Sequence, residues 1–231
     1  MTPDAASLVN LARKYIGRRY VLGVLVPKDD AAWMEPFDCS EFAAWLVYQT
    51  TQTLFGCNPK QTNPAVANAH SSWFAKQAEE TGAVIPIEVA SGLPGALLVR
   101  KPAAGATGHV VVCTGDGGTI EAKGSKYGVV AGRVDGRRWD LGIRIPSLHY
   151  SESARARPVA APTASLSVGS SGGLVLQLQR ALLERGYQPG LLDGEFGTRT
   201  AAALMAFQRA EGEVVDGEAG PETLAALGIQ P

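Results

Sequence analysis

The chain has 231 residues, of which 45% are hydrophobic and 19% are charged, and its formal net charge is −1. This composition is typical of a folded globular protein and excludes a disordered or fibrous chain. The near-zero charge gives no electrostatic reason to expect binding to nucleic acid or to an anionic membrane surface. The sequence contains no run of 18 or more apolar residues, so it predicts no transmembrane helix. The length suits one large domain or two modest ones.

The N-terminus bears on the route of export, and the cysteines bear on disulfide, metal and catalytic chemistry. The first residues, MTPDAASLVNLARKYIG, lack the basic and then apolar segments of a standard secretory signal. We therefore expect export by phage lysis or by a dedicated secretion system. The three cysteines, Cys39, Cys57 and Cys113, form no disulfide framework, and no CxxC pair predicts a zinc site. The alternative is that one of the three cysteines is chemically reactive.

In chain order, helices come first and strands follow. Apolar spacing predicts a helix over residues 5–16, a second that begins at or just after Cys39, and a third over 65–80. Short strands are predicted over 96–99, 110–113, 119–122 and 142–145. Helices followed by an antiparallel sheet are typical of an α+β fold.

The last third of the chain reads as a separate domain. Residues 151–165 (SESARARPVAAPTAS) lack apolar periodicity and predict a linker between a domain of 1–150 and one of 166–231. DGEFGTRTAAAL (193–204) is repeated as DGEAGPETLAAL (216–227), and each DGExG predicts a turn that leads into a helix. With a helix over 174–185, the repeat predicts a small all-α three-helix domain.

The first segment that carries chemistry is FDCSEFAAWLVY, residues 37–48. A cysteine at a helix start lies where unpaired backbone N–H groups and the helix dipole favour negative charge. We therefore expect a lowered pKa for the Cys39 thiol and a larger population of the nucleophilic thiolate. The alternative is a buried cysteine that acts as a small hydrophobic residue. The polar neighbours Asp38 and Ser40 make deep burial less natural.

The second segment is GHVVVCTGDGGTIEAKG, residues 108–124. His109 stands at the start of an apolar strand, where it can face the Cys39 helix. There it can take the thiol proton and later protonate the leaving amine. A lone histidine in this position is more often a core residue bonded to a backbone carbonyl, but its combination with Cys39 reverses that preference.

A cysteine–histidine pair usually needs a third group that orients the imidazole, and Glu121 is the candidate. If the hairpin centres on Gly115, position 121 pairs with position 109 and both side chains share one face. If Asp116 and Gly117 form a two-residue turn, Glu121 pairs with Val112 and faces away from His109. Both registers remain open from sequence, as does a solvated charge at position 121.

These segments resemble the NlpC-type cell-wall cysteine peptidases, a papain-like family. The matching pieces are YIGRRYVLG (15–23), FDCSEF (37–42), PGALLV (94–99) and GHVVVCTGDGGTIEA (108–122). The resemblance implies a papain-like fold with Cys39 as nucleophile, His109 as base and position 121 as the third polar residue. It also implies that Tyr20 approaches the catalytic cysteine. We expect Tyr20, Asp38 and Ser40 to support the substrate and the oxyanion, together with backbone N–H groups at the helix start.

The chain departs from the family pattern at several positions. The family commonly has Gly or Ser in place of Glu41, Asp in place of Ala96, and a glycine pair in place of Gly23-Val24. Its third catalytic residue is more often His, although Glu is also seen there in the related amidase branch called CHAP. These departures leave open the cleaved bond and the role of Glu121.

Residues 166–229 resemble the three-helix peptidoglycan-binding domain found on many cell-wall enzymes, through both DGExG turns and apolar positions such as Leu178, Leu182 and Phe207. Together the two resemblances predict a peptidoglycan hydrolase that needs no cofactor or metal. By resemblance, it cleaves the stem-peptide amide after D-γ-glutamate, and its C-terminal domain raises the local substrate concentration by tethering.

Three other functions compete with this prediction. They are an N-acetylmuramoyl-L-alanine amidase, a catalytically silent wall-binding protein, and an acyltransferase, whose histidine should precede its cysteine. We expect action on the cell wall, in the periplasm or outside the cell. A phage endolysin, a secreted effector with a matching immunity protein, and a self-remodelling hydrolase all fit the sequence.

Overall fold

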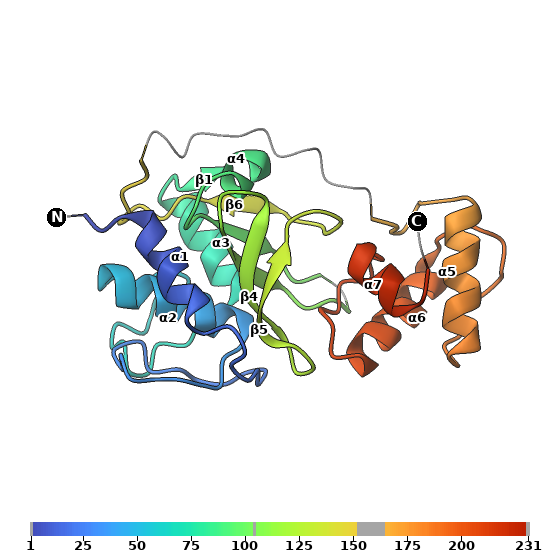
Figure 1. The fold of residues 1–231 in the computed structure, drawn as a ribbon, viewed down its shortest axis with the longest axis horizontal. Helices are drawn as coiled ribbons and strands as arrows, with labels where there is room; N and C mark the ends of the chain where they lie inside the picture. The colour runs from blue at the N-terminus through green and yellow to red at the C-terminus, as the bar shows by residue number, and fades with distance from the viewer. Residues whose placement is uncertain (1, 104, 152–164, 230–231) are drawn as a thin grey trace. The chain divides into compact units, whose positions relative to one another are not determined.

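The computed structural model describes residues 2–103, 105–151 and 165–229 (Figure 1). The chain divides into two compact units. The first comprises residues 1–102, 108–134 and 139–160, and the second comprises 103–107, 135–138 and 161–231. Apart from its two end residues, the linker predicted over 151–165 lies outside the described residues. The domain boundaries at 150 and 166 therefore stay predictions.

An antiparallel six-stranded sheet, in the order β1-β6-β2-β3-β4-β5, forms the centre of the first unit. Its strands are β1 (Val84–Ile85), β2 (Leu97–Arg100), β3 (His109–Cys113), β4 (Gly118–Gly124), β5 (Gly128–Arg133) and β6 (Leu141–Ile143). Every residue of β2 and β3 is buried. A strand that is covered on both faces reads as a continuous apolar run, which explains the sequence HVVVC.

Four helices accompany this sheet: α1 (Ala5–Arg13), α2 (Cys39–Thr51), α3 (Ser71–Glu80) and α4 (Ile87–Ser91). Helices α1 and α2 pack on β3 and β4, as Figure 1 shows, whereas α3 and α4 contact β2. The nucleophile helix predicted from Cys39 therefore lies directly against the strand predicted to carry the histidine. The predicted α+β class is confirmed.

The second unit contains α5 (Gly173–Glu184), α6 (Thr198–Ala210) and α7 (Pro221–Ala226), which share one apolar core. The internal repeat has a structural cause. The Gln179 side chain donates to Asp193 and accepts the Gly194 N–H, and the Gln208 side chain does the same with Asp216 and Gly217. Each helix thus holds the DGExG turn that follows it, so the prediction of a three-helix domain is confirmed.

Three short elements are absent from the predictions, namely β1, α4 and β5. The third helix also begins at Ser71 rather than at residue 65, because the His70 side chain accepts the Ser72 N–H and caps the helix there. None of the helices in the described part of the chain is long and apolar enough to cross a membrane.

Candidate active site

Cys39 is the first residue of α2, and Asp38 is its N-cap. One carboxylate oxygen of Asp38 accepts the Glu41 N–H at 2.8 Å, and the other accepts the Gly23 N–H at 3.0 Å. The cap therefore fixes both the helix start and the loop that follows Tyr20. The prediction that α2 begins at Cys39 is confirmed.

His109 and Glu121 are in direct contact. The imidazole Nε2 lies 2.6 Å from a carboxylate oxygen of Glu121, and both residues are at most 2% exposed. The register pairs Val112 with Ile120. Neither predicted register is therefore correct, since the hairpin centres on Asp116. Extended by one pair, this register sets Glu121 opposite Val111. Glu121 is then the diagonal neighbour of His109 on the same face of the sheet, and long side chains at diagonal positions can reach each other.

The other carboxylate oxygen of Glu121 accepts the Thr119 hydroxyl at 2.9 Å. Both groups approach Gly132 of β5 so closely that a Cβ there would lie 2.6 Å from the carboxylate and 2.9 Å from the hydroxyl. Sequence reasoning missed Thr119 and Gly132. The available signal was a glycine within a strand, which often marks a close approach by another group.

Trp139 covers the imidazole. Its ring stacks on His109 with centroids 6.2 Å apart and an interplanar angle of 29°. The indole N–H donates to the Val134 carbonyl at 3.1 Å, which fixes the ring. The structure therefore places Trp139 over the candidate base.

The structure brings the cysteine and histidine segments together. The backbone N–H of Val110, the residue after His109, acts on the Cys39 thiol and lowers its pKa, and the Ser40 hydroxyl lies 3.8 Å from the sulfur. Tyr20 is anchored beside Phe37 by an isolated bridge. Burial, followed by the nearby Cys39 and Asp38, raises the pKa of the Tyr20 hydroxyl, which stays protonated and able to donate.

The charge state of Cys39 differs from the prediction. Burial and then the Asp38 carboxylate raise the pKa of Cys39 to about 12, and the Ser40 hydroxyl, the Val110 N–H and the buried Arg100 act in the opposite direction. The expected lowering by the helix start is therefore wrong in sign. Because the thiol is protonated at neutral pH, a nearby base is needed before it can attack.

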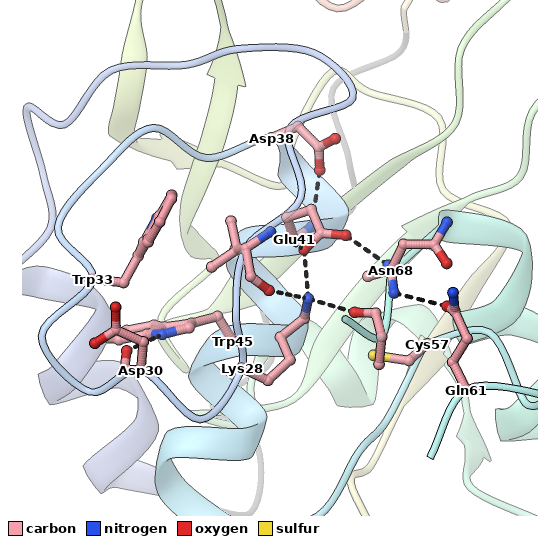
Figure 2. A network of polar contacts seen from close by, with 12 residues as sticks. Lys28, Asp30, Trp33, Asp38, Glu41, Trp45, Cys57, Gln61 and Asn68 are labelled. Atoms are coloured by element: carbon pink, nitrogen blue, oxygen red, sulfur yellow. Dashed lines mark hydrogen bonds and ion pairs between the residues drawn. The ribbon is translucent and has the colours of Figure 1, made fainter. Parts of the chain in front are cut away.

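A buried ion pair between Lys28 and Glu41 lies at the first turn of α2 (Figure 2). Lys28 Nζ is 2.5 Å from Glu41, and neither side chain is more than 2% exposed. Glu41 also accepts the N–H groups of Val26 and Ala69, while Lys28 donates to the carbonyls of Val26 and Ala67. The pair therefore joins two loops to the first turn of α2.

Those two loops form the walls of a cavity of about 500 Å³, between residues 22–25 and 66–70, and Asp38 and Glu41 contribute to its lining. Because Asp38 immediately precedes Cys39, this cavity lies next to the candidate nucleophile. No group of three His, Cys, Asp or Glu side chains in the described residues is placed to hold a metal ion.

Comparison with known proteins found similarity in separate parts of the chain. Residues 171–227 match the family model described as a putative peptidoglycan binding domain. The match confirms the resemblance predicted for the C-terminal segment. Among solved structures, the NlpC/p60 domain of the peptidoglycan hydrolase SagA is 28% identical and covers 62% of this chain and 99% of that domain, with a TM-score of 0.43.

Two curated relatives match a shorter stretch. The N-acetylmuramoyl-L-alanine amidase CwlM of Mycobacterium tuberculosis is 48% identical over 56 residues, which are 24% of this chain and 14% of that protein. The zinc D-Ala-D-Ala carboxypeptidase of Streptomyces albus G is 48% identical over 64 residues, which are 26% of this chain and 24% of that protein. The chain thus spans less than a quarter of the length of either relative.

Proposed function

We propose that this protein is a peptidoglycan hydrolase in which Cys39 is the nucleophile, His109 the general base and Glu121 the group that orients the base. The buried 2.6 Å contact between His109 Nε2 and Glu121 carries the proposal. A carboxylate in this position holds the imidazole in one tautomer and stabilises the imidazolium that forms during the reaction. If His109 were only a structural residue of the core, a buried carboxylate beside it would have neither of these functions.

In this proposal each ring nitrogen of His109 has its own task. Nε2–H donates to Glu121, so Nδ1 takes the proton from the Cys39 thiol. The thiolate attacks the amide carbonyl, and the imidazolium returns the proton to the leaving amine as the C–N bond breaks. Water, deprotonated by His109, then attacks the thioester. The acid product leaves and the proton returns to the Cys39 sulfur.

The oxyanion needs donors near the sulfur. Asp38 accepts the N–H groups of Ser40 and Glu41, so the Cys39 N–H is the first donor of α2 that can serve. The protonated Tyr20 hydroxyl is the second donor in this proposal. Asp38 and Ser40 hold the helix start and the sulfur in place.

The substrate in this proposal is the stem peptide, cleaved after D-γ-glutamate. The C-terminal unit holds the enzyme on the wall, so we propose action in the periplasm or outside the cell. Hydrolysis at the sugar–peptide junction is the alternative reaction. The same catalytic groups serve both, and the mass of the product distinguishes them.

The test is mass spectrometry of purified peptidoglycan digested by the wild-type protein or by Cys39→Ala. Fragments released by the wild type alone establish the enzyme, and their masses identify the bond. If neither protein releases fragments while both sediment with the wall, the hydrolase proposal fails and the protein is a wall-binding protein without catalysis.

A further inference from the structure

A second cavity lies at the opposite end of the nucleophile helix. It has a volume of about 600 Å³ and is bounded by the C-terminal part of α2, the loop of residues 53–64 and α3. This volume is within the usual range for small-molecule sites. None of the groups assigned to catalysis lines it, so the proposed reaction leaves the cavity without a role.

Two aromatic residues line this cavity, Tyr48 on α2 and Trp73 on α3, and both are half-buried. The indoles of Trp33, Trp45 and Trp139 each donate to a backbone carbonyl. In contrast, no protein group among the described residues bonds to the Trp73 indole N–H or to the Tyr48 hydroxyl. The cavity therefore combines aromatic surface with polar atoms that have no protein partner there.

Three carboxamides add oriented donors to the lining. The side-chain oxygens of Asn58, Gln61 and Gln77 each accept a backbone N–H, from Lys60, Asn68 and Gly56 respectively. Figure 2 shows this contact for Gln61 and Asn68. Because the oxygen is engaged, each side chain is fixed with its NH₂ group as the remaining donor.

The cavity carries no unbalanced charge. Its only charged lining residues are Lys76 and Glu80, which lie 3.8 Å apart as an exposed pair. A neutral lining gives no advantage to a ligand rich in carboxylates. It suits a ligand with apolar C–H faces that pack on aromatic rings and with many hydroxyl and carbonyl acceptors.

We propose that this cavity binds a neutral saccharide, the N-acetylated glycan strand of peptidoglycan, as a second substrate site of the catalytic unit. The proposal rests on the proposed function for the source of the saccharide. The rise of α2 separates Tyr48 from Cys39 by about 14 Å, which about four extended peptide residues span. A sugar held at one end of the helix thus leaves its stem peptide within reach of the nucleophile at the other end.

The test is calorimetric titration of the full chain, as Cys39→Ala, with an N-acetylglucosamine tetramer. This probe contains no peptide bond to cleave, so binding is measured independently of catalysis. We expect Trp73→Ala to weaken binding roughly tenfold and Tyr48→Phe roughly threefold, as lost aromatic and hydroxyl contacts do. The matched control Trp33→Phe changes an indole outside the cavity and should leave the affinity unchanged.

The absence of binding by the parent protein overturns the proposal. Equal affinity in the parent, Trp73→Ala and Tyr48→Phe also overturns it, because the saccharide would then bind elsewhere on the chain. Either result leaves the hydrolase proposal standing if the wild type releases fragments from peptidoglycan. Conversely, saccharide binding that depends on Trp73 survives a failure of the digestion experiment.

Discussion

At the residue scale, the proposal makes the Glu121 carboxylate the group that orients the base and balances its charge. Glu121→Gln removes the carboxylate but keeps the size of the side chain, and its amide NH₂ can hold His109 in the other tautomer. We expect kcat to fall by about 10²–10⁴ with a small change in KM, as happens when a triad carboxylate is replaced. Initial rates on a soluble stem peptide measure this. A loss below threefold would remove Glu121 from the mechanism.

The two polar neighbours of Cys39 should have opposite effects on its reactivity. The Asp38 carboxylate raises the pKa of Cys39, whereas the Ser40 hydroxyl lowers it. Because the thiol is largely protonated below about pH 12, Asp38→Asn should increase the thiolate fraction at pH 8, and Ser40→Ala should decrease it. We expect iodoacetamide alkylation of Cys39 to change roughly threefold in each direction.

Mass mapping of the labelled peptide separates Cys39 from the two other thiols. Both of these are buried, and burial raises the pKa of Cys57 to about 11. For every variant, alkylation of Cys39 should accelerate as pH rises from 7 to 10. A rate for the wild type that is independent of pH across this range would mean that the thiolate is already formed, contrary to the raised pKa.

A substitution at Gly132 tests whether the position of the Glu121 carboxylate matters, since it adds a methyl group without changing any charge. In Gly132→Ala the new Cβ would lie 2.6 Å from the Glu121 carboxylate oxygen that accepts the Thr119 hydroxyl, so the carboxylate must leave its present position beside His109. We expect kcat to fall at least about tenfold, because small displacements of catalytic groups are costly. Gly173→Ala is the matched control, since nothing lies within 4 Å of its added Cβ. Equal activity of the two variants would contradict the assigned role of Gly132.

The sequence predicted the candidate site unevenly at this scale. Cys39 and His109 were predicted because one stands at a helix start and the other at the start of an apolar strand. Glu121 was also predicted, but its orientation depended on a hairpin register that two reasonable turns left open. Thr119 and Gly132 were not predicted, because their contacts with Glu121 exist only once β4 and β5 lie side by side.

At the element scale, the Lys28–Glu41 pair connects the nucleophile helix to two loops. Lys28→Met leaves a buried carboxylate without its cation, which costs about 3–5 kcal/mol. The double variant Lys28→Met/Glu41→Gln buries no charge and keeps a side-chain oxygen for one of the backbone N–H groups. We therefore expect the double variant to recover part of the free energy of unfolding that the single variant loses.

Urea unfolding followed by tryptophan fluorescence measures this free energy. All four tryptophans belong to the first unit, so the signal reports on the unit that contains the pair. A double variant as unstable as Lys28→Met alone would show that the lost backbone contacts, and not the unpaired charge, dominate. From the sequence, Glu41 was noted only as a departure from the family pattern, and its pairing with Lys28 was not predicted.

Element types were more predictable than their pairing. The buried strands β2 and β3 and the helix at Cys39 follow from apolar runs and a capping residue, which are local. Strand β5 was not predicted because GVVAGR contains two glycines and has weak alternation, and its place in the sheet comes from pairing with β4. Register and edge strands depend on contacts between distant segments, which a local pattern does not encode.

At the scale of the whole molecule, the proposed function assigns chemistry to the first unit and attachment to the second. A tethered binding unit raises the local concentration of an insoluble substrate but does nothing for a freely diffusing one. The repeated Gln–Asp–Gly contacts hold both DGExG turns to their helices, and the three helices share an apolar core. We therefore predict that residues 166–231 alone fold and sediment with peptidoglycan.

The matching prediction concerns residues 1–150 produced without that unit. We expect their turnover of a soluble stem peptide to equal that of the full chain, while solubilisation of insoluble peptidoglycan falls roughly 10- to 100-fold because the tether is lost. Turbidity loss of sacculi and peptide release, measured on the same two preparations, separate the two effects. If both rates fall together, the C-terminal unit supports the folding or the site of the catalytic unit, and attachment is not its main contribution. If neither rate falls, the catalytic unit binds the wall well enough by itself.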